Sequence, residues 1–321
     1  MELFLIPGFV LLLLGGEASV RGSVALAQRL GVSPFIVGLT IVGFGTSLPE
    51  MFVSVDAVLS GHPGLAVGNV IGSNIANLLL ILGAASLLAP IAVNPSTVRL
   101  DTFAMALATL IFIGFGITGG FTVSLGILLL VFLTTYIGFT IWHGEKSDGP
   151  AGLPHEETVD RDRNSSRIIS IVTIIAFGLC AVAVGAEFLV LGATELAMGL
   201  GVPDEVIGLT VIAIGTSLPE LATATVAAYR GQSEICVGNV LGSNIFNLFG
   251  ITGVASLLTP TLGFSDRIIN FDLLVLLAAT MILVFFFITG RRIFRLPGFV
   301  FLCMYCAYVF AHYTGVASAV Y

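Results

Sequence analysis

The chain has 321 residues, of which 57% are hydrophobic and only 10% are charged. With a mean hydropathy of +1.08, this composition excludes an ordinary soluble protein and indicates a protein whose solvent is lipid. The formal net charge is −7, and the dense run of charge is confined to residues 145–167, a distribution that excludes binding to DNA or RNA.

Ten apolar runs follow one another along the chain. A helix needs about 20 apolar residues to cross a hydrocarbon layer roughly 30 Å thick, and each run approaches or exceeds that length. Strands of a membrane barrel would alternate polar and apolar residues, whereas these runs stay apolar. We therefore predict an all-α polytopic membrane protein with ten transmembrane helices, over residues 2–26, 34–59, 64–89, 100–118, 121–143, 168–199, 204–228, 235–259, 268–289 and 297–319.

A polar stretch, residues 144–167, divides these runs into five and five. Because five crossings are an odd number, the second half enters the membrane from the opposite side, and homologous halves must then be inverted repeats. The predicted organisation is a first five-helix repeat over residues 1–143, a linker over 144–167, and a second, inverted repeat over 168–321.

The two halves share sequence. Shifting the chain by 170 residues aligns residues 38–87 with 208–257 without a gap, and 26 of these 50 positions are identical. The identities concentrate in Gly-Thr-Ser-Leu-Pro-Glu, at 45–50 and 215–220, and in Gly-Asn-Val-x-Gly-Ser-Asn-Ile-x-Asn, at 68–77 and 238–247. These residues are polar, small or helix-breaking, and a membrane helix has little structural use for them at mid-span, so they indicate a functional site.

The basic residues lie mainly on one side of the predicted bundle. Ten Lys and Arg residues fall on the side of the linker and only Arg267 on the other, with Arg21 left out because its place in the first span is ambiguous. The positive-inside rule then puts the linker, residues 144–167, in the cytoplasm and both termini outside. We predict a multi-pass protein of the cell (inner or plasma) membrane.

Glu50 and Glu220 are repeat-related acidic residues within apolar spans. An ionised carboxylate at the centre of a membrane helix costs on the order of 3 kcal/mol. No Lys, Arg or His occurs in the central part of either span or of the span that follows, so a bound cation is the favoured partner. The alternative is that both residues are protonated and serve only helix packing.

A helical turn places two hydroxyls beside each carboxylate. Thr46 and Ser47 precede Glu50 by four and three residues, so the three side chains share adjoining helix faces. Pro49 disturbs the helical bond to the Gly45 carbonyl, which frees backbone oxygen atoms to turn towards an ion. The second repeat reproduces this pattern with Thr216, Ser217, Glu220 and the helix-breaking Pro219.

The next span of each repeat adds a hydroxyl and an amide. Ser73 and Asn77 are four residues apart and share a helix face, as do Ser243 and Asn247. Glycines at spacings of four let helices approach closely, and we assign four of them to helix packing: Gly68, Gly72, Gly238 and Gly242.

Every donor in this set is an oxygen atom, which suits Ca²⁺ or several Na⁺ ions and does not suit thiophilic metals. Two carboxylates balance the charge of one divalent ion, whereas three Na⁺ ions would leave one positive charge over. Exchange of three Na⁺ ions for one Ca²⁺ ion would be electrogenic.

The two motifs resemble the alpha-repeats of the Ca²⁺/cation antiporter superfamily, in particular its Na⁺/Ca²⁺ exchanger branch of the prokaryotic type. The resemblance implies ten helices in two inverted repeats, with ion sites on the second, third, seventh and eighth helices. It also implies the ligand set Thr46, Ser47, Glu50, Ser73, Asn77, Thr216, Ser217, Glu220, Ser243 and Asn247, together with the backbone carbonyls of Gly43 and Ala213.

K⁺-dependent relatives carry an acidic residue at the position of Asn247, so the resemblance argues against K⁺ co-transport. We expect an antiporter that exchanges Na⁺ for Ca²⁺ by alternating access, with Ca²⁺/H⁺ or K⁺-dependent Na⁺/Ca²⁺ exchange on the same site as alternatives. A cation channel and an intramembrane hydrolase are less favoured, since broken inverted repeats suit a carrier and neither Ser47 nor Ser217 has a basic neighbour in its motif. We expect no enzyme activity, no cofactor, and no partners other than Ca²⁺, Na⁺ and membrane lipid.

Overall fold

The computed structural model describes residues 2–144, 161–199, 213–290 and 292–313, and its elements are almost all helical. The first half contains α1 (Glu2–Leu30), α2 (Pro34–Val37), η1 (Gly38–Val42), α3 (Gly43–Thr46), α4 (Leu48–Leu59), α5 (Pro63–Ile75), η2 (Ala76–Ile81), α6 (Leu82–Leu88), α7 (Pro95–Ile117) and α8 (Val123–Gly144). The second half contains α9 (Arg161–Gly199), α11 (Ala213–Gly215), α12 (Leu218–Tyr229), α13 (Ser233–Ile245), η4 (Phe246–Ile251), α14 (Thr252–Leu257), η5 (Ile268–Asp272), α15 (Leu273–Thr289) and α16 (Arg295–Tyr313). The η segments are π-helical turns.

Nine of the helices in the described part of the chain are long and apolar enough to cross a membrane. The first part of the seventh predicted span, 204–228, and the last part of the tenth, 297–319, lie outside the described residues. The count of ten therefore stays a prediction. Helix bounds differ from the hydropathy-based ranges where polar residues extend a helix. For example, α7 begins at Pro95, before the predicted residue 100, because the Asn94 side chain accepts a hydrogen bond from the Ser96 N–H and caps the helix.

Two of the spans form the centre of the bundle. Of the residues in the apolar windows of Pro63–Leu88 and Ser233–Leu257, 78% and 83% are buried, whereas the other seven windows reach at most 44%. These two spans carry the Ser/Asn motifs. The motifs therefore lie at the protein interior and not on the surface that faces lipid.

The second span of each half is interrupted at the serine that both Gly-Thr-Ser-Leu-Pro-Glu motifs share. α3 ends at Thr46 and α4 begins at Leu48, with Ser47 at φ −84° and ψ 5° between them. Ser217 has nearly the same conformation, φ −89° and ψ 3°, before α12. Pro49 and Pro219 each lie in the first turn of the following helix, where a missing N–H leaves no helical bond unmade.

Close backbone contact joins α13 to α2 and η1. A β-carbon on Gly242 would collide with the backbone of Leu39, and one on Gly238 would collide with the backbone of Phe35. Both glycines therefore permit the approach of two helices. Around Gly68 and Gly72 no described residue lies within 4 Å of the β-carbon position. Residues 205–209, which the 170-residue shift would place there, lie outside the described residues, so the packing role of Gly68 and Gly72 stays a prediction.

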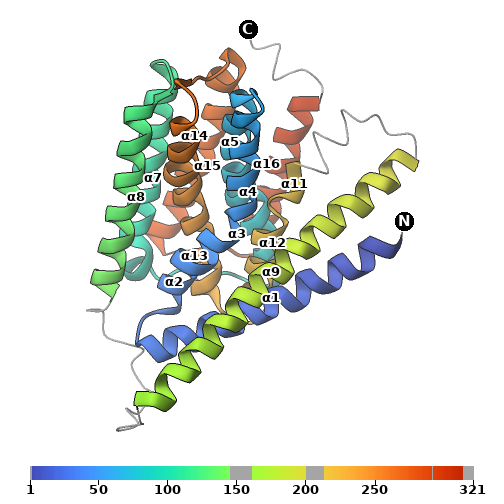
Figure 1. The fold of residues 1–321 in the computed structure, drawn as a ribbon, viewed down its shortest axis with the longest axis vertical. Helices are drawn as coiled ribbons and strands as arrows, with labels where there is room; N and C mark the ends of the chain where they lie inside the picture. Colours follow the sequence, from blue (N-terminus) through green and yellow to red (C-terminus); the bar gives the residue numbers. More distant parts are fainter. Residues whose placement is uncertain (1, 145–160, 200–212, 291, 314–321) are drawn as a thin grey trace.

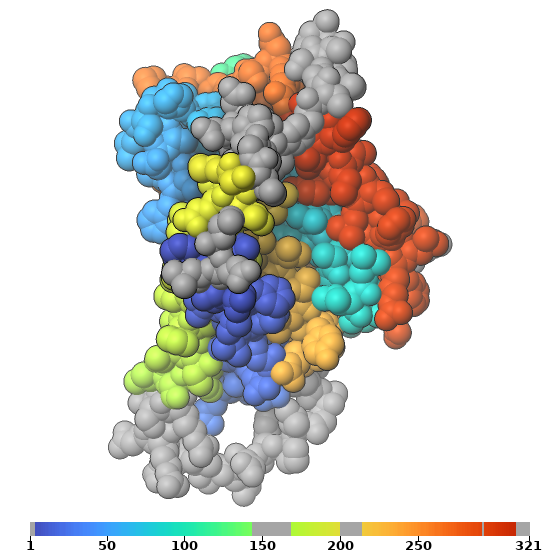
Figure 2. Space-filling view, turned by 90° about the vertical axis from the view of Figure 1, so that its right-hand side faces the viewer, coloured from blue at the N-terminus to red at the C-terminus, as the bar shows by residue number. Residues whose placement is uncertain are grey.

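Helices α1 and α9 form a separate oblique layer on one side of the bundle (Figure 1). Their backbones approach so closely that a β-carbon on Gly8 would lie 2.9 Å from the carbonyl oxygen of Gly185. Figure 2 shows this face, with α1 in dark blue beside the gold α12. An ion pair ties the layer to the bundle, because Glu17 of α1 accepts a hydrogen bond of 2.8 Å from Arg230 at the end of α12.

A two-residue pair of antiparallel strands connects the two halves away from the motifs. Strand β1 (Phe121–Thr122) pairs antiparallel with β2 (Thr261–Leu262). These strands lie at the ends of α7 and α14 and take no part in the cluster of polar residues described below.

Candidate ion-binding site

Glu50 and Glu220 lie in the first turns of α4 and α12, directly after the two helix interruptions. Their exposed fractions are 0% and 1%. The N-terminal end of a helix favours a negative charge, which offsets part of the cost of burying each carboxylate. The two carboxylates are close enough to interact electrostatically, and since both are acidic this interaction is repulsive when both are ionised.

Serines of each repeat lie against the carboxylate of the other repeat. The Ser47 hydroxyl donates a hydrogen bond of 3.0 Å to Oε1 of Glu220. Ser217 lies near the carboxylate of Glu50, although the two do not reach hydrogen-bond geometry. The two Gly-Thr-Ser-Leu-Pro-Glu motifs, separated by 170 residues in sequence, thus face each other in space.

The Ser/Asn motifs join the same cluster. Asn247 donates a hydrogen bond of 2.9 Å from its amide to the Ser73 hydroxyl, and the Ser243 hydroxyl donates one of 3.0 Å to the carbonyl of Gly43. Thr46 lies within 3.5 Å of Ser243 across the same boundary. Predicted ligands from α3 to α5 in the first half therefore meet those of α12 to η4 in the second.

Several buried polar atoms of this cluster have no hydrogen-bond partner among the described residues. They are both carboxylate oxygens of Glu50, Oε2 of Glu220, the hydroxyl of Ser217, Oδ1 of Asn247, and both polar atoms of the Asn77 amide. A buried polar atom left without a partner costs about 1–3 kcal/mol, and more when it is charged. Within the described ranges no Lys, Arg or His forms an ion pair with either glutamate. Cations in contact with these oxygen atoms would offset the cost.

Two predicted ligands are less well defined. Thr216 is half-buried in the turn between α11 and α12. Ala213 begins α11, directly after residues that lie outside the described part of the chain. The other ten predicted ligand residues are buried together.

Asn69 and Asn239 were not among the predicted ligands, although both belong to the second motif. The Asn69 amide donates to the carbonyl of Glu50 at 3.1 Å, and the Asn239 amide donates to the carbonyl of Glu220 at 3.4 Å. The sequence signal that could have identified them is that asparagine occurs at this position in both repeats, one helical turn before Ser73 and Ser243. Sequence alone did not show that these amides reach the backbone of the glutamates.

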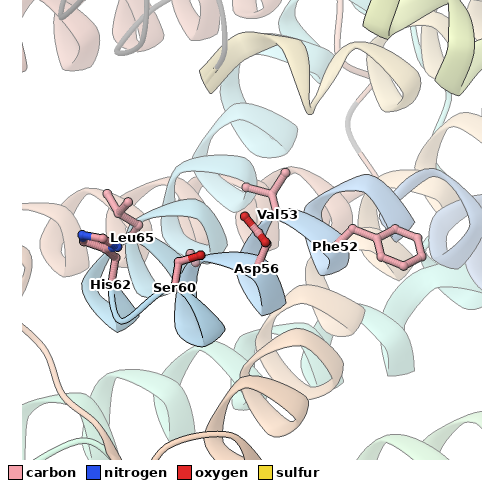
Figure 3. Close-up of a pocket in the computed structure, with 7 residues that line it drawn as sticks. Phe52, Val53, Asp56, Ser60, His62 and Leu65 are labelled. Carbon is pink, nitrogen blue, oxygen red and sulfur yellow. The ribbon is translucent and has the colours of Figure 1, made fainter.

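A surface pocket of about 510 Å³ lies at the far end of α4 (Figure 3). Its lining includes Phe52, Asp56, Ser60 and His62. Asp56 lies along this open face and Glu50 lies in the first turn of the same helix. The pocket is therefore distinct from the buried oxygen cluster.

A buried, doubly acidic cluster of oxygen atoms inside a bundle of membrane-length helices defines a protein that handles cations within the membrane. The model of the family described as sodium/calcium exchanger protein matches residues 3–142 and 170–314. The chain belongs to the sodium/calcium exchanger family. This membership confirms the family predicted from the two motifs.

Similarity to individual proteins extends over nearly the whole chain. The chain is 34% identical to the putative antiporter CaxA of Alkalimonas amylolytica, over 95% of this chain and 96% of that protein. It is 32% identical to the sodium/calcium exchanger MaX1 of Methanosarcina acetivorans, over 96% and 97% of the two chains. Its fold matches the sodium-calcium exchanger NCX_Mj, soaked with 2.5 mM Na⁺ and 1 mM Sr²⁺, with a TM-score of 0.82, 33% identity and 95% coverage of each chain. The prediction of an all-α polytopic membrane protein is thereby confirmed.

Proposed function

We propose that this protein is a secondary active antiporter that exchanges Na⁺ for Ca²⁺ across the membrane. The observation that carries the proposal is the meeting of both sequence motifs in one buried cluster, with two carboxylates and no basic partner among the described residues. Family membership and the likeness to NCX_Mj support the same ions. Family members are transporters, which supports the expectation that the protein is not an enzyme.

The proposed ligands are the oxygen atoms of the sequence-derived set, with Glu50 and Glu220 supplying the charge. Carboxylate, hydroxyl, amide and carbonyl oxygens form the flexible coordination that Ca²⁺ accepts. Two ionised glutamates neutralise one Ca²⁺, whereas three Na⁺ ions carry one charge more. Exchange of three Na⁺ ions for one Ca²⁺ ion moves net charge across the membrane.

The proposed architecture is two inverted five-helix repeats, over residues 1–143 and 168–321. The paired interruptions at Ser47 and Ser217 and the paired amide contacts of Asn69 and Asn239 support this arrangement. The protein lies in the cell membrane, with the linker in the cytoplasm and both termini outside. Rocking of one group of helices against the other opens the buried cluster to one side at a time.

The test is ⁴⁵Ca²⁺ uptake into proteoliposomes that contain the purified full chain, with the membrane potential clamped at zero or at a set value. We expect uptake that requires an outward Na⁺ gradient, is unchanged when K⁺ is removed, and responds to the imposed potential. Uptake driven by a pH gradient without Na⁺ would assign Ca²⁺/H⁺ exchange instead, and a K⁺ requirement would assign the K⁺-dependent reaction. Ca²⁺ flux that needs no counter-ion would identify a channel and overturn the proposal.

A further inference from the structure

We propose that Asn239 is a positioning residue of the ion site, which fixes both the direction of the Thr46 hydroxyl and the backbone of Glu220. The inference rests on the proposed function, since Thr46 and Glu220 are proposed ion ligands. Asn239 is 0% exposed and lies on α13, one turn before Ser243.

The side-chain amide of Asn239 makes contacts in both halves of the protein. Its Nδ2 donates to the carbonyl of Glu220 at 3.4 Å and to the hydroxyl of Thr223 at 3.0 Å, both on α12. Its Oδ1 accepts a hydrogen bond of 3.2 Å from the hydroxyl of Thr46, at the end of α3. A single side chain therefore links the two interrupted spans.

The chemistry of these partners decides which way the amide faces. A backbone carbonyl can only accept a hydrogen bond, so the nitrogen of Asn239 must face the carbonyl of Glu220. Its oxygen must then face Thr46. The amide orientation is thus set by Glu220, and the amide in turn offers Thr46 an acceptor and not a donor.

This acceptor determines how Thr46 can serve a cation. A hydroxyl has one proton and two lone pairs, and a hydroxyl that coordinates a cation must turn its proton away from the ion. The carbonyl of Gly43 is a second acceptor for Thr46, at 3.3 Å, but it already accepts from Ser243 at 3.0 Å. The Ser243 hydroxyl also lies 3.5 Å from Oδ1 of Asn239, but its single proton is directed to the nearer carbonyl of Gly43. Asn239 is therefore the less occupied acceptor for the Thr46 proton, and accepting this proton leaves the Thr46 lone pairs for the ion.

The repeat-related residue Asn69 supports a recurring role. Its Nδ2 donates to the carbonyl of Glu50 at 3.1 Å and to the hydroxyl of Ser54 at 2.9 Å. Each glutamate backbone is thus held by an asparagine of the following span. Asn239 adds the contact to Thr46, which connects the two repeats.

Asn244 offers a matched control on the same helix. It is 1% exposed, and its amide donates 2.7 Å to the carbonyl of Val240 within α13. It is a buried asparagine whose amide nitrogen donates within its own helix. Replacing it removes a buried amide without removing the link to Thr46.

The experiment compares Asn239→Leu, Thr46→Val, their double variant and Asn244→Leu in the full-length protein. Half-saturating Ca²⁺ and maximal rate are measured in proteoliposomes, and unfolding temperature is measured in detergent. We expect Asn239→Leu to raise half-saturating Ca²⁺ about tenfold, as loss of one effective hydrogen bond implies. In the double variant, the two increases in half-saturating Ca²⁺ should combine to less than their product, since both changes disable the Thr46 hydroxyl and only Asn239→Leu also releases the carbonyl of Glu220.

Asn244→Leu should lower the unfolding temperature and leave half-saturating Ca²⁺ within about twofold of the unaltered protein. The proposal is overturned if Asn239→Leu shows the same pattern as Asn244→Leu, or if its effect multiplies with that of Thr46→Val. Asn239→Ala, whose smaller side chain introduces no steric conflict, carries the same test if the leucine variant does not fold. Absence of Na⁺-driven uptake by the unaltered protein would refute the proposed function itself, which is a distinguishable result.

Discussion

Replacing either buried carboxylate, by Glu50→Gln or Glu220→Gln, is expected to abolish Na⁺-driven Ca²⁺ uptake. Each change keeps the shape of the side chain but removes half of the negative charge that faces the ion. Removing one partner of a buried charge pair costs about 3–5 kcal/mol, which corresponds to more than a hundredfold loss of affinity. The measurement is ⁴⁵Ca²⁺ uptake in proteoliposomes, with Ca²⁺-dependent thermal stabilisation in detergent as a second readout of binding.

Asp56→Asn provides the control for this prediction, because Asp56 is an exposed carboxylate on the same helix as Glu50. We expect this variant to retain uptake and thermal stabilisation by Ca²⁺. Without ions, both glutamine variants should unfold at the same temperature as the unaltered protein or higher, because they relieve repulsion between two buried acidic groups. Normal exchange by both glutamine variants would show that the glutamates are not ion ligands.

Among the substitutions proposed here, Gly242→Val is expected to lower the unfolding temperature most. The added β-carbon would lie 2.7 Å from the carbonyl carbon of Leu39, and closer still to its oxygen. Because these are backbone atoms, α13 and η1 would have to separate, and overpacking of this kind costs roughly 1–3 kcal/mol or more. We expect the unfolding temperature in detergent to fall by about 5–10 °C and exchange activity to fall with it.

Gly114→Ala is the matched change for the stability prediction. Gly114 lies within α7, and no described residue lies within 4 Å of its β-carbon position. Alanine favours a helix over glycine by about 1 kcal/mol, so this variant should be as stable as the unaltered protein or more so. Equal stability of Gly242→Val and Gly114→Ala would contradict the close contact between α13 and η1.

The apolar runs and the repeated motifs were sufficient to predict the helical membrane fold and its family. Membrane helices must satisfy their own backbone groups, so hydropathy alone reports most spans. The spacing of three and four residues predicted that Thr46 and Ser47 share a helical turn with Glu50, but the helix is interrupted at Ser47, and the Ser47 hydroxyl donates to Glu220 of the other repeat. The 170-residue shift matched each of these residues with the equivalent residue in the other half.

Contacts between the repeats were beyond the reach of the sequence. The bond from Ser47 to Glu220 and the link from Asn239 to Thr46 depend on how two folded halves pack against each other. The position of the helix interruption also differed in detail. Pro49 was expected to disturb the bond to Gly45, whereas the interruption falls at Ser47 and Pro49 lies in the first turn after it.

The lengths of α1 and α9 have a consequence for the surrounding lipid. Their membrane-length parts, Phe4–Leu30 and Ile168–Gly199, contain 27 and 32 residues. At 1.5 Å per residue they extend about 40 and 48 Å, well beyond a hydrocarbon core of roughly 30 Å. A helix longer than the hydrocarbon core is accommodated by inclination, in agreement with the slanted course of α1 and α9 in Figure 1. Bilayer thickness therefore acts on the angle of these two helices, and through Glu17 and Arg230 on the bundle to which they are joined.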